Sequence, residues 1–100
     1  MPLMHLPAVV PNEGARRLAW IIGNTEKPHV AVTLLEAMLG FGVIDRILSG
    51  ELLPGVRMGA RLWAWSGGQI DAYDFRHKPM GWWFDRPEAR EMQRVLARAA

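Results

Sequence analysis

Two stretches in the first 40 residues carry apolar side chains at helical spacing. They cover residues 13–24 and 28–39, and their apolar residues recur three and four positions apart, which places them on one helical face. Asn12 can cap the first stretch with its side chain, and Pro28 opens the second, where its missing amide is harmless. We therefore expect two helices that each bury one face. The residues expected to be buried are Ala15, Leu18, Ile21 and Ile22, then Leu34, Leu35, Met38 and Leu39.

The middle of the chain predicts two more helices separated by a short break. Residues 40–49 are apolar at helical spacing, and Gly50 stands where a left-handed residue would close that helix. Pro54 cannot extend this helix but suits the start of the next one, over 54–66, which a Gly-Gly pair ends. The apolar faces are Val43, Ile44, Ile47 and Leu48 in the first helix, and Val56, Gly59, Ala60 and Trp63 in the second.

The remaining residues predict a short helix and a longer terminal one. Asp71 can cap a short helix over 71–76. Asp85 and Glu88 have the spacing of a capping box, which predicts a terminal helix over 85–99. The apolar stripe of that helix consists of Met92, Val95, Leu96 and Ala99, and its basic stripe consists of Arg86, Arg90, Arg94 and Arg98.

Three consecutive aromatic residues, Trp82, Trp83 and Phe84, precede the terminal helix. Three large rings in a row cannot all face one core. They either form a lid, in which two rings pack onto the body and one stays partly exposed, or anchor a dimer, because aromatic residues dominate interface anchors. Both interpretations stay open.

Composition limits the architecture to one domain with one core. The chain has 100 residues, half of them apolar, and no cysteine, which fits a reducing compartment. No apolar run approaches the ~20 residues of a membrane span, and the start lacks the pattern of a secretion signal. We expect a cytoplasmic protein with no membrane contact. Its parts are an arm over 1–12, a helical domain over 13–76, and an aromatic loop with a basic helix over 77–100.

Charge is distributed unevenly along the chain. Residues 1–75 carry six Lys/Arg and seven Asp/Glu, whereas residues 76–100 carry six and three. Non-specific affinity for DNA comes from cations that meet phosphates, so the tail arginines would have to contribute if DNA is the partner. We expect Arg16 and Arg17, to the side of the first helix, to be solvated.

The sequence offers no residue set for catalysis. His5, His29 and His77 lack the spacing of a helical metal pair, and neither Ser49 nor Ser66 lies in a nucleophile motif. The glycine-containing segments resemble helix ends rather than a phosphate-binding loop. We therefore expect no enzyme, no metal and no cofactor.

Residues 42–75 resemble the Cro/repressor-like (lambda-repressor-like) helix-turn-helix family, in particular its small prophage-type members. In that family the recognition helix ends in a hydrophobic-Leu-Ser-Gly pattern, a loop closed by proline follows, and a helix then leads to a glycine corner and an aspartate-aromatic pair. The matching segments are IDRILSG at 44–50, ELLP at 51–54, GARLW at 59–63, SGGQI at 66–70 and DF at 74–75.

This resemblance implies an all-α domain of five or six helices, with a helix-turn-helix core and an extra C-terminal helix. It implies a sequence-specific transcription regulator, a repressor of phage or mobile-element type, that binds a two-fold operator in double-stranded DNA as a homodimer. The implied DNA-binding residues are Phe41, Gly42, Val43, Asp45, Arg46, Ser49, Arg57 and Arg61. The implied subunit contacts are Trp82, Trp83, Phe84, Met92, Val95 and Leu96.

The alternative is a helix-turn-helix fold that binds another protein instead of DNA. Two observations favour it: the body is nearly neutral, and the candidate recognition helix has few of the donors and acceptors that read base edges. An exposed edge from Phe41 to Val43 would suit a repressor, polymerase or host factor equally well. In that case Arg46 would form an internal ion pair, for example with Glu51.

Overall fold

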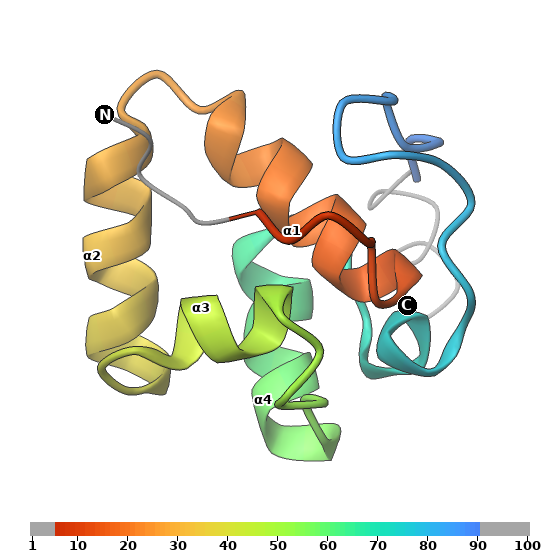
Figure 1. Ribbon diagram of the computed structural model, residues 1–100. Coiled ribbons are helices and arrows are strands. Elements are labelled where there is room, and N and C mark those ends of the chain that lie inside the picture. Colours follow the sequence, from red (N-terminus) through yellow and green to blue (C-terminus); the bar gives the residue numbers. More distant parts are fainter. Residues whose placement is uncertain (1–5, 91–100) are drawn as a thin grey trace, which may run out of the picture.

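The computed structural model describes residues 6–90, and these residues form a helical domain without strands (Figure 1). The all-α prediction is confirmed, but the prediction of five or six helices is wrong for this range. Four elements are α-helices and the fifth is a 3-10 helix. The elements are α1 Glu13–Gly23, α2 Pro28–Leu39, α3 Val43–Leu48, α4 Val56–Trp65 and the 3-10 helix η1 Ala72–Arg76. No helix in residues 6–90 has the length and apolar character needed to span a membrane.

Short-range signals set the helix ends largely as expected. The side chain of Asn12 accepts a hydrogen bond from the backbone N–H of Ala15 at 2.8 Å and caps α1. Asp71 caps η1 by accepting from the N–H groups of Tyr73 and Asp74. Gly50 has a φ of 83°, the left-handed conformation expected after α3. An added Cβ at Gly50 would also lie 2.7 Å from the Pro11 side chain, so this glycine lets the arm approach.

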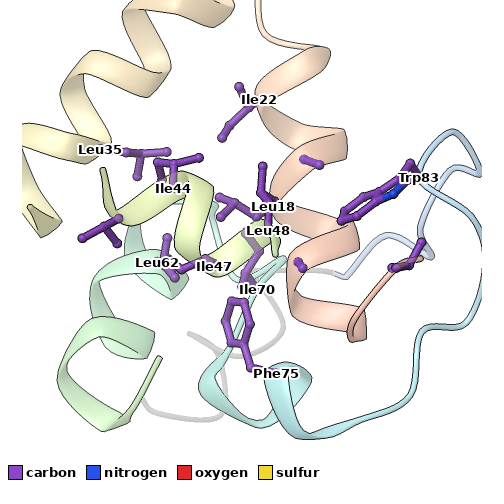
Figure 2. Close-up of a cluster of buried hydrophobic side chains, with 14 residues drawn as sticks. Leu18, Ile22, Leu35, Ile44, Ile47, Leu48, Leu62, Ile70, Phe75 and Trp83 are labelled. Atoms are coloured by element: carbon purple, nitrogen blue, oxygen red, sulfur yellow. The ribbon is translucent and has the colours of Figure 1, made fainter. Parts of the chain in front are cut away.

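The core lies where all four helices converge (Figure 2). Helix α3 is central to it, because Ile44, Ile47 and Leu48 all point inward from one short helix. The other elements close around these three side chains. The remaining labelled core residues are Leu18 and Ile22 from α1, Leu35 from α2, Leu62 from α4, and Ile70, Phe75 and Trp83 from the chain that follows.

Helix α2 buries less than its sequence pattern predicts. Leu35 is fully buried and Leu39 is half-buried, but Leu34 is 59% exposed and Met38 is also exposed. Figure 1 shows the reason, since α2 stands at the edge of the domain, with α1 and α3 on one side of it only. A narrow stripe formed by Ala31 and Leu35 is sufficient for this packing.

The terminal helix does not begin where the capping-box spacing predicts. Residues 85–90 are not helical, and the Asp85 carboxylate instead accepts from the backbone N–H of Trp82 at 2.8 Å. The Asp85 side chain therefore closes a turn within 82–85 and is not available to cap a helix. Residues 91–99, which include the predicted contacts Met92, Val95 and Leu96 and the arginines Arg94 and Arg98, lie outside the described residues.

Candidate functional site

A three-residue turn joins α2 to α3. Gly40 and Gly42 have φ values of 127° and 76°, which residues with a Cβ atom rarely adopt. The Glu36 carboxylate of α2 accepts from the backbone N–H of Gly42 at 2.6 Å, directly before α3 begins. Arg61 of α4 donates to the carbonyl oxygen of Met38 at 3.0 Å. These contacts tie α2, α3 and α4 together at the turn and hold α3 in one orientation.

Helix α3 has one buried face and one exposed face. Asp45, Arg46 and Ser49 are exposed, as a candidate reading face requires. Val43 is buried, as its place on the apolar face predicts, so the alternative expectation of an exposed edge from Phe41 to Val43 is wrong at Val43. Val43 begins the helix on the same face as Ile47, and this face packs into the core. Gly42 is half-buried at the N-cap position.

Phe41 is almost fully outside the protein. Its side chain is 98% exposed in the turn, more than any other large apolar residue among 6–90. The backbone between two left-handed glycines turns it away from the core. Phe41 lines an open depression with Thr33, Glu36 and Ala37 at the end of α2. The turn therefore presents an apolar contact point next to α3.

Arg46 forms the internal ion pair that the alternative interpretation predicts. Its Nε lies 3.7 Å from Oε1 of Glu51, and both side chains are more than half exposed. Such an exposed pair contributes about 0–1 kcal/mol, so a ligand can displace it. Ser49 donates to the carbonyl oxygen of Arg46 and accepts from the N–H of Glu51. The polar groups of α3 are thus ordered but remain accessible.

The two arginines of α4 lie in different environments. Arg57 is exposed in the first turn of the helix. Arg61 is also exposed, but its hydrogen bond to Met38 fixes the guanidinium at the end of α2. Arg61 therefore positions the turn as well as supplying charge, whereas Arg57 has no ion-pair partner among residues 6–90.

An open groove of about 440 Å³ runs between α3 and the N-terminal arm. One wall is formed by Leu6 and Pro7 of the arm. The other is formed by the exposed side of α3 and the residue that pairs with Arg46. These lining residues are Asp45, Arg46, Ser49 and Glu51.

The aromatic segment divides into one buried ring and two outward ones. Trp83 is 2% exposed, and its indole N–H donates to the carbonyl oxygen of Pro7 at 2.9 Å. Trp82 and Phe84 are exposed. The lid interpretation, which expects two packed rings, is met only at Trp83, and the predicted subunit contact is wrong for this buried residue. Trp82 and Phe84 stay candidates for a subunit contact.

A buried ionic cluster on α1 was not predicted from the sequence. Arg16 and Arg17 were expected to be solvated, but they are 3% and 4% exposed. The Glu13 carboxylate receives hydrogen bonds from both guanidinium groups, at 2.8 and 3.1 Å. Spacings of three and four residues could have indicated these pairs, because they place charges on one helix face. Burial could not be foreseen, since residues distant in the sequence complete it: Arg16 donates to the Asp85 carbonyl and Arg17 to the Gln69 carbonyl.

A second ionic cluster fixes the last described residues to η1. The two terminal guanidinium nitrogens of Arg90, Nη1 and Nη2, donate to the Asp74 carboxylate at 2.8 Å. The side-chain amide of Gln69 accepts from the Arg90 backbone N–H and donates to the Arg90 carbonyl oxygen. This pairing removes Arg90 from the basic stripe expected to meet phosphates. Together with the hydrogen bond from the Met80 N–H to Glu13, it straps residues 77–90 across α1 and η1.

Both buried carboxyl groups have a pKa below the ordinary value. Burial by itself raises the pKa of Glu13, but hydrogen bonds from Arg16 and Met80 and the nearby arginine charges outweigh it. Burial likewise raises the pKa of Asp74, and the hydrogen bonds from Arg90 and the Asp71 backbone together with the charges of Arg90 and Arg17 outweigh it. Folding therefore favours the ionised form of both groups.

These shifts predict acid-sensitive stability. A carboxyl group with a lowered folded-state pKa contributes stability that is complete above its ordinary pKa, which is 4.5 for Glu13 and 3.8 for Asp74. That contribution is lost as the pH falls through the folded-state pKa. We expect urea midpoints to be level from pH 7 to pH 5.5 and to fall steeply below pH 4.5. Asp74→Asn should be less stable at pH 7 and show a shallower acid dependence, and an unchanged dependence would contradict this assignment.

The site residues do not form a metal centre. Among residues 6–90, no group of three or more His, Cys, Asp or Glu side chains could hold a metal ion. Comparisons with protein-family models, curated proteins and solved structures found no match to this chain. Functional inference therefore depends on the geometry of α3 and its surroundings.

Proposed function

We propose that the protein is a sequence-specific DNA-binding transcription regulator, a cytoplasmic repressor of phage or mobile-element type. One observation carries the proposal: α3 exposes Asp45, Arg46 and Ser49 on a helix whose opposite face is fixed in the core. Side chains on the exposed face of a rigidly packed helix can be held in register with base edges. The short glycine turn and its contacts with α2 and α4 supply that rigidity.

The dimensions and chemistry of α3 fit the major groove. A helix of six residues is about 9 Å long and enters a groove about 12 Å wide. Arg46 can donate to guanine, Asp45 can accept from the amino group of cytosine, and Ser49 can do either. Phe41, which protrudes beside these residues, offers an apolar surface to a thymine methyl group.

Phosphate contacts are few in this proposal. Arg57 is the exposed cation of α4 that is free to reach a phosphate, and Arg61 adds charge from its fixed position. Asp45 and Glu51 partly offset these charges, so non-specific affinity is expected to be low. A dimer with two phosphate contacts per protomer has a slope of about −3.6 in log affinity against log salt.

A two-fold operator requires a dimer, and the exposed aromatic residues suit that role. Trp82 and Phe84 lie on the segment that is strapped over α1, so their positions are fixed relative to the body. A contact through these rings would hold two copies of α3 at a constant spacing, as half-sites one helical turn apart require.

The proposal is tested by selecting binding sites from random DNA with the purified protein and titrating the selected site. Arg46→Ala is expected to weaken binding to that site by about 1–3 kcal/mol and to relax preference at one base pair per half-site. Arg57→Ala is the matched control, because a lost phosphate contact weakens binding to all sequences and makes the salt slope shallower. No enriched site from a folded sample, or an unchanged preference in Arg46→Ala, would contradict the proposal.

A protein partner is the second candidate, and the exposure of Phe41 favours it. A phenylalanine that is 98% exposed and lines an open depression with Thr33 and Ala37 is an apolar contact point for a partner protein. In this case Phe41→Ala abolishes capture of the partner, while Arg46→Ala leaves it intact. If DNA is the ligand, Arg46→Ala weakens binding in the DNA titration more than Phe41→Ala does.

A further inference from the structure

The N-terminal arm lies within contact range of whatever occupies the exposed side of α3. Figure 1 shows the arm running along α1 on the side from which α3 is also seen. Leu6 and Pro7 form the wall of the groove that faces Asp45, Arg46 and Ser49. The groove is open, and its volume of about 440 Å³ is that of a small-molecule site. A ligand held by the polar wall therefore also touches the apolar wall.

The arm is fixed in this place by contacts at both ends of its described part. Trp83, itself buried, donates its indole N–H to the Pro7 carbonyl at 2.9 Å. Val10 is buried in the core, and Pro11 packs against the backbone at Gly50 directly after α3. Asn12 then caps α1. The wall formed by Leu6 and Pro7 is thus built into the fold.

The two walls present complementary chemistry. The α3 wall carries the guanidinium donor of Arg46, the hydroxyl of Ser49 and the carboxylate acceptors of Asp45 and Glu51, and these are groups that read base edges. The arm wall carries aliphatic carbons, which are the groups that contact the thymine methyl. A major-groove edge that contains both a hydrogen-bonding base and a thymine offers both kinds of partner side by side.

We propose that the arm is a second reading element of the DNA interface, in which Leu6 contacts a thymine methyl group beside the bases read by Arg46 and Ser49, and that Trp83 is the residue that positions it. This inference rests on the proposed DNA-binding function. It assigns roles in specificity to Leu6, which lies 37 positions before α3, and to Trp83, which lies 35 positions after it.

The test uses the full-length protein and the DNA site selected by the wild type. Each thymine of the site is replaced in turn by deoxyuridine, which removes the methyl group and leaves the hydrogen-bonding groups in place. The wild type is expected to lose affinity roughly fourfold when one particular thymine of each half-site is replaced. This is the loss expected when one buried methyl group is removed. Leu6→Ala should lose about the same on the normal site and show no further loss on the uridine site at that position.

Val9→Ala is the matched control for Leu6→Ala. Val9 lies on the same arm, is largely exposed and does not line the groove. This variant should retain the wild-type sensitivity to uridine. If Leu6→Ala and Val9→Ala keep equal sensitivity, the arm does not read thymine and the inference is overturned.

Trp83→Phe tests the positioning role. Phenylalanine keeps an aromatic ring in the buried site but cannot donate to Pro7. We expect a cooperative unfolding transition, retained affinity for the uridine-substituted site and a loss of the thymine preference. Unchanged thymine preference would show that Trp83 only fills space, which overturns its assignment as a positioning residue.

Failure of the inference and failure of the proposed function are distinguishable. If the wild type selects a site and Arg46→Ala alters its preference, but Leu6→Ala and Trp83→Phe do not, DNA binding stands and the arm is not a reading element. If the folded wild type selects no site, both are wrong.

Discussion

Glu13→Ala is expected to lower the free energy of unfolding by about 3–5 kcal/mol, because it leaves two buried guanidinium groups without the carboxylate that faces both. Arg16 and Arg17 lie 2.8 and 3.1 Å from that carboxylate, and both are almost fully buried. The change also removes the acceptor for the Met80 N–H, which anchors residues 77–90 to α1. Urea unfolding at pH 7, followed by circular dichroism, measures the loss.

Two further variants separate this effect from a general loss of charge. Glu26→Ala removes an exposed carboxylate near the start of α2 and should change stability by no more than about 0.5 kcal/mol. Replacing Glu13 with leucine and both arginines with methionine should recover part of the loss, since a buried charge cluster is often replaceable by apolar residues. A loss below about 1 kcal/mol for Glu13→Ala would show that the arginines find other acceptors or water.

Phe75→Ala and Gly14→Ala are each expected to destabilise the fold, yet to compensate for one another in combination. Phe75 is 2% exposed, and its removal leaves a cavity that costs about 3–5 kcal/mol. A Cβ added to Gly14 would lie 2.3 Å from Cδ1 of Phe75, and such overpacking costs about 1–3 kcal/mol. In the double variant the new methyl group enters the vacated space. The loss in free energy of unfolding should therefore be smaller than the sum for the two single variants by about 1 kcal/mol or more.

Gly23→Ala is the control for the glycine substitution. Gly23 is the last residue of α1, and an added Cβ would meet no atom within 4 Å. Alanine there should be neutral or stabilise the protein by up to about 1 kcal/mol, because it restricts the unfolded chain more than glycine does. Additive costs for Gly14→Ala and Phe75→Ala would mean that α1 shifts to relieve the clash before the ring is removed.

The candidate site could be predicted from the sequence only in part. The spacing of apolar residues in 43–48 correctly left Asp45, Arg46 and Ser49 on the outside of α3, because a helix with one apolar face has a defined opposite face. The same spacing correctly placed Val43 on the apolar face, and only the expectation of an exposed edge from Phe41 to Val43 is wrong at Val43. The second wall of the groove could not be predicted, because Leu6 is almost 40 residues away from Asp45 and no local pattern links them.

The boundaries of α1 and α2 and most inward residues of α1 and α3 follow from the sequence alone, because the signals that set them act over a short range. The helix expected over 40–49 begins only at Val43. A cap such as Asn12 acts on an amide three residues away, a left-handed glycine such as Gly50 ends a helix by its own φ, and apolar spacing is read within one or two turns. Only the tertiary structure decided that Arg16 and Arg17 are buried, that Asp85 closes a turn instead of capping a helix, and that Trp83 holds the arm beside α3. Each of these outcomes depends on which distant groups the packing brings within hydrogen-bond distance. Those groups are backbone atoms, which residue types do not distinguish, so the sequence does not reveal them. They are the carbonyls of Asp85, Gln69 and Pro7 and the amide N–H of Trp82.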